Sequence, residues 1–252
     1  MVRRTQVVLA GRGGDPIDAE RFAPDGAAPG PRAGVVLVHE VFGLDAFARG
    51  AATRLAEAGY VVLAPDLYSR EGVPGPVGDD ADPAPAWTPD QIRSAAAGLP
   101  DRRAVSDLDA AAAALARDPE VDAERIATIG FCLGGKLAFL LGCQSRRLAA
   151  VIDFYGTIRY GSLDADHPVQ PLEMALGLES PLLAVFGAED SSIPIEDVDA
   201  MRHQLEAFAK TCDIHVVPGV GHGFLNPLRG AYAQDAAQEA WALALAFLED
   251  NL

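Results

Sequence analysis

Cys132 lies in a segment whose residue types suit nucleophilic catalysis, GFCLGG at positions 130–135. The pattern G-x-C-x-G is a cysteine version of the nucleophile elbow, in which small residues two before and two after the nucleophile permit a tight strand-to-helix turn. Such a turn places the sulfur at a helix N-terminus, where backbone N–H groups favour a thiolate. The pattern therefore predicts that Cys132 is a nucleophile, with the N–H of Leu133 directed at the same space.

An acid and a histidine follow Cys132 in the order that this chemistry requires. In α/β hydrolases the nucleophile precedes the acid, and the acid precedes the histidine. Asp190 comes after an apolar run at 182–186, and His222 comes after another at 213–217, each on a glycine-containing loop. We expect Cys132 to attack a carbonyl carbon, His222 to transfer protons and Asp190 to orient the imidazole.

Other residues compete for these roles, and each also has a simpler explanation. Glu189 is adjacent to Asp190 and is the alternative acid. His39 ends the first central strand, and we expect it to support the site from behind rather than to react. A lone cysteine is more often a buried small residue or a redox-sensing thiol, but neither role needs an ordered acid and histidine. Three histidines fall in a helical pattern, a proline-containing loop and a strand, and we expect them to be structural or solvated: His203, His167 and His215.

The elements that must position these residues alternate along the chain. Short apolar runs alternate with alanine-rich stretches, which predicts a mostly parallel central sheet with helices on both faces. The proline- and glycine-rich stretch at 70–90 predicts a surface loop rather than a linker, because the alternation continues on both sides of it. The prediction is one α/β domain over residues 1–252, with its core from about residue 33 onward. We expect strands at 35–38, 60–64, 126–129, 150–154, 182–186 and 213–217, and helices at 48–58, 106–117, 133–142, 196–210 and 232–248.

The composition narrows the classes of partner. Lys and Arg number 20 against 36 Asp and Glu, and the net charge of −16 opposes binding to nucleic acid or to an anionic membrane. No apolar run approaches the roughly 20 residues of a membrane-spanning helix, and the run at 7–10 is too short for a signal peptide. Three cysteines, at positions 132, 143 and 212, predict free thiols and a reducing, cytoplasmic compartment. We expect no metal site, because the histidines and carboxylates lack ligand spacing. We also expect no cofactor, and a protein that is a monomer or a small homo-oligomer.

Four segments together resemble the dienelactone hydrolase family, the carboxymethylenebutenolidases: HEVFGL at 39–44, APDLY at 64–68, GFCLGG at 130–135 and HGF at 222–224. The likeness runs from about residue 33 to the C-terminus. It implies a compact single-domain α/β-hydrolase fold with a Cys-Asp-His triad that hydrolyses an enol-lactone without a cofactor. By position it also implies that Glu40 helps to activate the resting thiol. The backbone N–H of Val41 would then form the oxyanion hole together with that of Leu133.

The resemblance is weaker for the substrate. Its best-known members bind a substrate carboxylate with two arginines, one of them four residues after the catalytic histidine, where this chain has Asn226. Arg229 is three residues further along, and we expect it on the surface. Trp87, in the segment from Gly72 to Leu99, could shape one wall of the pocket. The second arginine could be Arg70, Arg93, Arg102 or Arg103. The substrate-binding candidates are therefore Trp87, Arg102, Arg103, Asn226 and Phe42.

These observations predict a hydrolase that cleaves a small-molecule lactone or carboxylic ester through a thioester on Cys132. The alternative is a general carboxylesterase or thioesterase of the same fold that acts on neutral esters. An enolate or alkoxide leaves more easily than an amine, so a thiol nucleophile favours esters over peptides.

Overall fold

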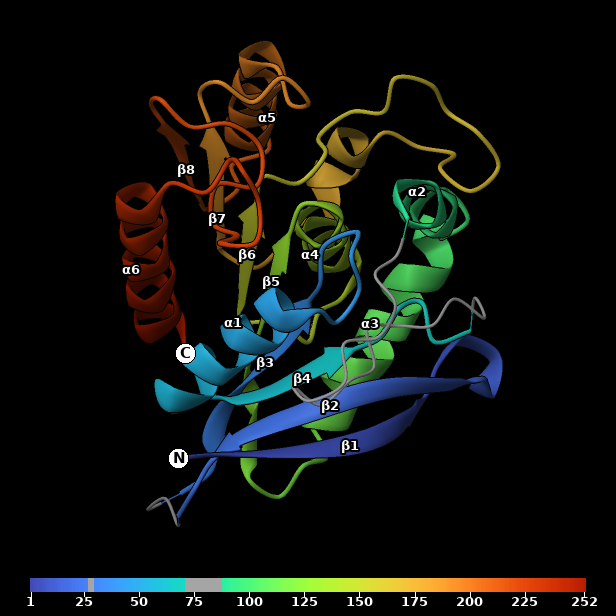
Figure 1. Ribbon diagram of the computed structural model, residues 1–252, viewed down its shortest axis with the longest axis vertical. Coiled ribbons are helices and arrows are strands. Elements are labelled where there is room, and N and C mark those ends of the chain that lie inside the picture. Colours follow the sequence, from blue (N-terminus) through green and yellow to red (C-terminus); the bar gives the residue numbers. More distant parts are fainter. Residues whose placement is uncertain (27–29, 71–87) are drawn as a thin grey trace.

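The computed structural model describes residues 1–26, 30–70 and 88–252 (Figure 1). Its described strands form one eight-stranded sheet, in the order β1-β2-β4-β3-β5-β6-β7-β8. The strands are β1 (Val2–Ala10), β2 (Pro16–Pro24), β3 (Arg32–Val38), β4 (Val61–Pro65), β5 (Val121–Phe131), β6 (Ala150–Phe154), β7 (Leu182–Gly187) and β8 (Cys212–Val217). The strands from β4 to β8 pair in parallel, whereas β1 and β2 join the sheet antiparallel at one edge. The predicted mostly parallel sheet of a single-domain α/β fold is confirmed.

Helices cover both faces of the sheet (Figure 1). They are α1 (Ala46–Glu57), α2 (Pro89–Ala97), α3 (Asp101–Leu115), α4 (Leu133–Gln144), α5 (Ile195–Ala207) and α6 (Gln234–Asn251), with short 3₁₀ segments η1 (Arg12–Gly14) and η2 (Pro171–Gly177). Helices α1 and α6 lie on one face, where the Arg54 guanidinium stacks over the Trp241 ring, 4.8 Å from its centroid. Helices α3 and α4 pack together on the other face. In the part of the chain that the structure describes, no helix is long and apolar enough to cross a membrane.

The parallel register places the ends of the central strands at one edge of the sheet. Val38 of β3 is level with Gly130 of β5, and Gly187 of β7 is level with Val217 of β8. The central strands β4, β6 and β7 are buried along their whole length, as expected for parallel strands covered on both faces. The loops that leave this carboxyl edge carry the predicted site, which is where open α/β sheets bind ligands.

Two parts of the fold were not anticipated. The hairpin β1–β2 extends the sheet, although β1 carries no buried residue and is polar at positions 3–6. Helix α2 begins at Pro89, where a loop was expected, and is started by a capping box between Thr88 and Gln91. The remainder of the expected loop, residues 71–87, lies outside the described residues.

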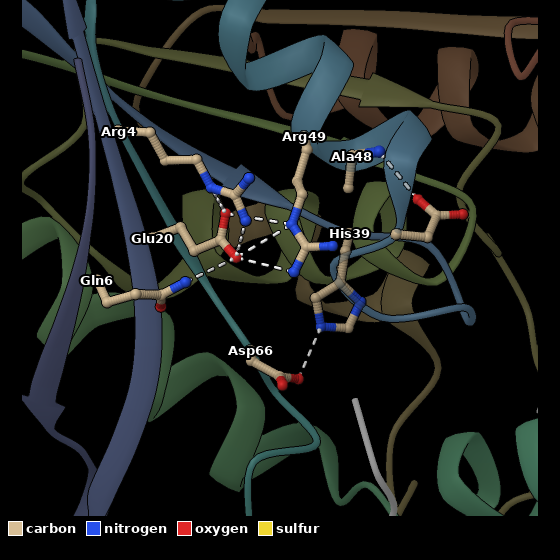
Figure 2. A network of polar contacts seen from close by, with 8 residues as sticks. Arg4, Gln6, Glu20, His39, Ala48, Arg49 and Asp66 are labelled. Carbon is tan, nitrogen blue, oxygen red and sulfur yellow. Dashed lines mark hydrogen bonds and ion pairs between the residues drawn. The ribbon is translucent and has the colours of Figure 1, made fainter. Parts of the chain in front are cut away.

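A buried carboxylate ties the hairpin to the body of the protein (Figure 2). Glu20 of β2 is 2% exposed and pairs with Arg4 of β1 and Arg49 of α1 at N–O distances of 2.8 and 2.9 Å. The Gln6 amide donates a further hydrogen bond to the same carboxylate. Because these partners are all donors, Glu20 can keep its charge inside the protein.

Candidate active site

Cys132 occupies a strained turn between β5 and α4. Its backbone has φ 57° and ψ −117°, a conformation that few residues other than glycine adopt. A Cβ on Gly130 would overlap the Gly134 carbonyl oxygen, and a Cβ on Gly134 would overlap the Val38 carbonyl oxygen. Gly130 and Gly134 of the GFCLGG segment are therefore required by close backbone contacts. The result is that the half-buried thiol sits at the N-terminus of α4.

The structure brings Cys132, His222 and Asp190 into one line of hydrogen bonds. The His222 Nε2 lies 3.0 Å from the Cys132 Sγ, and its Nδ1–H donates to Asp190 Oδ2 at 2.7 Å. The other oxygen of Asp190 accepts the backbone N–H groups of Ser192 and Ile193. The aspartate is buried and held by three donors, so it fixes the orientation of the imidazole.

The protonation of His222 follows from these contacts. Burial alone would lower the pKa of the imidazole, but the hydrogen bonds to Asp190 and Cys132, with the negative charges of both groups, raise the pKa to about 10. A protonated imidazole beside the sulfur stabilises a thiolate. The arrangement places a thiol, an imidazole and a carboxylate in the order that nucleophilic catalysis uses.

The competing residues lie elsewhere. Glu189, the alternative acid, is exposed, and it is Asp190 that contacts the imidazole. His203 is on α5, His215 is on β8 beside Asp213, and His167 is in a loop beside Asp164.

Glu40 is the second residue after β3 and is buried in a polar cluster next to the triad. Its carboxylate accepts the Asn226 amide at 2.8 Å and the Tyr155 hydroxyl at 3.3 Å, and Arg229 Nη1 is 3.6 Å away. Burial raises the pKa of Glu40, although Asn226 and Arg229 act in the opposite direction. Within the described part of the chain its hydrogen-bond partners are Tyr155 and Asn226, not the thiol of Cys132.

Asn226 has a different place from the one predicted. The side chain is 1% exposed, its amide nitrogen donates to Glu40 and its amide oxygen accepts the Leu228 N–H. Both polar atoms are thus engaged within the protein. We therefore reassign Asn226 from substrate contact to holding Glu40.

Arg229 also differs from its expected surface position. Its side chain is half-buried, with the guanidinium stacked over the Phe42 ring at 4.9 Å and Nη1 facing Glu40. That Nη1 is buried and makes no hydrogen bond within the described residues. The position of Phe42 next to the site agrees with its selection from the sequence, while Arg229 supplies a cation that sequence reasoning undervalued.

The other arginine candidates lie on α2, on α3 and in the segment after β4. Arg102 lines a surface hollow with Gln144 and Arg147, at the opposite end of α4 from Cys132, and a helix of that length separates its ends by roughly 18 Å. Arg103 is half-buried on the first turn of α3. Arg70 pairs with Asp107 and Arg93 with Asp90. Trp87 lies outside the described residues.

Tyr155 is a site residue that sequence reasoning missed. It follows β6 with a positive φ of 43°, is fully buried and donates to Glu40. Its ring also makes a T-shaped contact with the His222 imidazole at a centroid distance of 5.2 Å. Its place immediately after a parallel strand, at the same sheet edge as Cys132, is the signal that would have identified it.

The fold and the site together define the class of protein. A nucleophile turn after β5, an acid after β7 and a histidine after β8 form the arrangement of an α/β hydrolase. A sequence profile described as "Dienelactone hydrolase family" matches residues 17–252. The chain belongs to that family, and its class of enzyme is a carboxylic ester hydrolase.

Individual relatives cover most of the chain. The "Putative carboxymethylenebutenolidase" of Salmonella typhimurium is 34% identical over 87% of this chain and 76% of its own length. The "Probable 2-oxo-3-(5-oxofuran-2-ylidene)propanoate lactonase" of a Bradyrhizobium species is 30% identical over 86% of this chain and 84% of its own. The crystal structure of a "Putative Dienelactone Hydrolase" from Klebsiella pneumoniae superposes with a TM-score of 0.88 at 31% identity, covering 99% of each chain.

Proposed function

We propose that the protein hydrolyses a lactone or carboxylic ester through a covalent thioester on Cys132. The observation that carries the proposal is the position of His222, with one ring nitrogen 3.0 Å from the Cys132 sulfur and the other 2.7 Å from Asp190. This arrangement activates a thiol and retains the proton that the reaction later needs.

Two transfers complete the reaction. The Cys132 thiolate attacks the carbonyl carbon, the C–O bond to the leaving oxygen breaks, and protonated His222 gives its proton to that oxygen. His222, now neutral, takes a proton from a water molecule whose oxygen attacks the thioester. The C–S bond breaks, the acid is released, and the thiolate beside protonated His222 is restored.

Backbone N–H groups are suited to stabilise the oxyanion formed in both steps. Leu133 is the first residue of α4, so its N–H has no acceptor within the helix. Val41 lies in the loop between β3 and α1, the region that provides the second donor in this class of fold. Loss of one such donor lowers kcat by about 10²–10³ in a comparable hydrolase.

Arg229 is our candidate for binding an anionic group on the substrate. The net charge of −16 repels an anionic lactone, so a local cation is needed. Arg229 is the charged partner of Glu40 at the site, and among the described residues its buried Nη1 has no hydrogen-bond acceptor. A substrate carboxylate would compete with Glu40 for this guanidinium.

A neutral substrate is the second candidate. The neutral Asn226 stands where the resemblance leads one to expect an arginine, and it is engaged with Glu40. A carboxylesterase or thioesterase acting on neutral esters fits that observation. Comparing kcat/KM for a dienelactone, a neutral aryl ester and an acyl thioester separates the candidates, and Arg229→Met should lower kcat/KM only for the anionic substrate.

Replacement of Cys132 by Ala tests the nucleophile. With an activated aryl ester, we expect a loss of more than about a thousandfold in kcat and no acyl adduct on the protein by mass spectrometry. Turnover near the wild-type rate would reject the proposal. Glu189→Gln is the matched control, because this exposed neighbour of the acid should leave the rate unchanged.

The three cysteines are free thiols in the structure. A thiol nucleophile works only while reduced, so we propose that the enzyme acts on its small-molecule substrate in the reducing cytoplasm.

A further inference from the structure

His39 is a fully buried histidine that the reaction above does not use. It follows β3 directly, and Figure 2 shows its ring beneath α1, facing the loop that carries Asp66. The Leu67 backbone N–H donates to His39 Nε2 at 3.1 Å. Because a backbone amide can only donate, Nε2 carries no proton, and the ring proton of the neutral imidazole must be on Nδ1.

The nearby carboxylate does not alter this assignment. Asp66 Oδ1 lies 4.0 Å from Nε2, beyond hydrogen-bond distance, and it already accepts the Tyr68 N–H. The Tyr68 ring packs against the imidazole at a centroid distance of 5.1 Å. The ring of His39 is therefore held in one orientation and one tautomer.

The protonated nitrogen is directed at the loop that contains Val41. His39 Nδ1–H donates to the Glu40 carbonyl oxygen at 2.6 Å. That oxygen also accepts the Gly43 N–H, at a longer 3.2 Å. The Glu40 carbonyl and the Val41 N–H belong to the same peptide unit, which is planar and trans, so the two groups point in opposite directions. Fixing the carbonyl on His39 therefore fixes the direction of the Val41 N–H.

The same segment is pressed against the nucleophile turn. A Cβ on Gly134 would overlap the backbone oxygens of both Val38 and His39. The end of β3 therefore touches the first turn of α4, which carries Cys132 and Leu133. A change in the orientation of the Glu40–Val41 peptide would therefore change the surroundings of the substrate carbonyl that Cys132 attacks.

We propose that His39 is a positioning residue that orients the Val41 N–H for oxyanion stabilisation through its bond to the Glu40 carbonyl. The proposal rests on the proposed function, since it concerns the oxyanion formed when Cys132 attacks. His39 does not touch the substrate. It acts as a neutral Nδ1–H donor, held in place by the Leu67 N–H at its other nitrogen.

Two amide variants separate the two ring nitrogens. In His39→Asn the side-chain NH₂ takes the place of Nδ1 and can still donate to the Glu40 carbonyl. In His39→Gln the amide reaches the place of Nε2, where its oxygen can accept the Leu67 N–H, but no side chain then replaces the Nδ1–H donor, and the Glu40 carbonyl keeps only the longer bond from the Gly43 N–H. With an activated aryl ester we expect His39→Gln to lower kcat by about tenfold or more, with KM nearly unchanged. His39→Asn should recover most of that loss.

Alkylation of the Cys132 thiol distinguishes a role of His39 at the oxyanion from a purely structural role. Iodoacetamide reacts with the thiolate at a saturated carbon and forms no oxyanion, so His39→Gln should be alkylated at Cys132 at the wild-type rate. Labelling of Cys132→Ala gives the background from Cys143 and Cys212.

Three results would overturn the proposal: wild-type kcat in His39→Gln, equal losses of kcat in both variants in proportion to their Tm, or a fall in alkylation that matches the fall in kcat. If Cys132→Ala itself retains esterase activity, the proposed function fails instead, whatever the His39 variants do.

Discussion

Cys132 and His222 are 90 residues apart in the chain, yet Sγ and Nε2 approach to 3.0 Å at the carboxyl edge of the sheet. The half-buried imidazole lies between this sulfur and the Asp190 carboxylate, with its pKa raised to about 10. The pair is therefore built to keep a positive charge beside the sulfur at neutral pH, before any substrate binds.

The pH dependence of thiol alkylation tests this pairing. A group with a pKa near 10 stays protonated below that pH, so the rate at Cys132 should be flat between pH 7 and 9. In His222→Asn, which has no imidazolium, the rate should be lower by about tenfold at pH 7 and should rise with pH as in an ordinary cysteine. Iodoacetamide labelling followed by mass spectrometry measures both profiles. A wild-type rate that climbs across this range would contradict the charged resting pair.

Asp190→Asn should be less damaging than the loss of Cys132 or His222. The asparagine can keep the Ser192 and Ile193 N–H groups on its oxygen, but its NH₂ then faces His222 Nδ1 and favours the tautomer with the proton on Nε2. A histidine in that tautomer cannot take the thiol proton. We expect kcat for an aryl ester to fall by about 10²–10³. Loss of activity in Glu189→Gln with full activity in Asp190→Asn would show that the neighbouring carboxylate is the acid.

The buried parallel strands were the easiest elements to predict from the sequence. Strands such as β6 and β7 are covered on both faces, so their runs are largely apolar and stand out from polar surroundings. Strand β1 was not predicted, because it is an edge strand with no buried residue. Such an edge tolerates charged side chains, here Arg3 and Arg4. Helix α2 was obscured by the proline- and glycine-rich stretch before it, although its capping box was readable.

The candidate site also has one part that the sequence predicts and another part that it does not. The contact among Cys132, His222 and Asp190 could be predicted because the strained turn at Cys132 demands glycines, and because chain order places the carboxylate and the imidazole. The surroundings of Glu40 could not. Asn226 and Arg229 reach it only through the turns after His222, where the Asn226 N–H bonds to Gly223 and the Arg229 N–H to Asn226. Spacing along the chain does not report such turns, so the cation appeared to belong to the surface.

Glu20→Gln should weaken the attachment of the hairpin. Burial alone would raise the pKa of Glu20, but hydrogen bonds from Arg49 and Arg4 outweigh it and lower the pKa below 4.5. A carboxylate with a lowered pKa adds stability above its unfolded value, and this stability is lost as the pH falls through the folded value. We expect a loss of about 2–4 kcal/mol in the free energy of unfolding at pH 7, and a smaller loss at pH 3, measured by urea denaturation.

Asp199→Asn is the matched control for Glu20→Gln. The Asp199–Arg202 pair has a similar distance of 2.7 Å but lies on the surface of α5. Its removal should cost no more than about 0.5 kcal/mol. Equal losses in the two variants would mean that Glu20 contributes no more than a surface pair, and that the hairpin is held by apolar contacts and by its backbone pairing with β4.

Asn226→Asp should create a repulsion that depends on Glu40. The amide that donates to Glu40 becomes a second carboxyl group in a buried site, with Arg229 at 3.6 Å from Glu40 as the neighbouring cation. The pKa of Glu40, already raised by burial, should rise further. A carboxyl group with a raised pKa costs stability as the pH climbs from its unfolded value through the folded one. The variant should therefore lie close to wild type near pH 5 and lose about 2–4 kcal/mol by pH 8 in urea unfolding.

The double variant Glu40→Gln/Asn226→Asp isolates the interaction between these two positions. With only one carboxyl group left in the cluster, the introduced glutamine amide can donate to the introduced carboxylate and reverse the direction of the original hydrogen bond. The deficit at pH 8 should then be smaller than the sum of the two single variants by about 1–3 kcal/mol. Additive losses with the pH dependence unchanged would mean that the added charge is repelled by some other group. In that case Asn226 would not be the residue that holds Glu40 beside the triad.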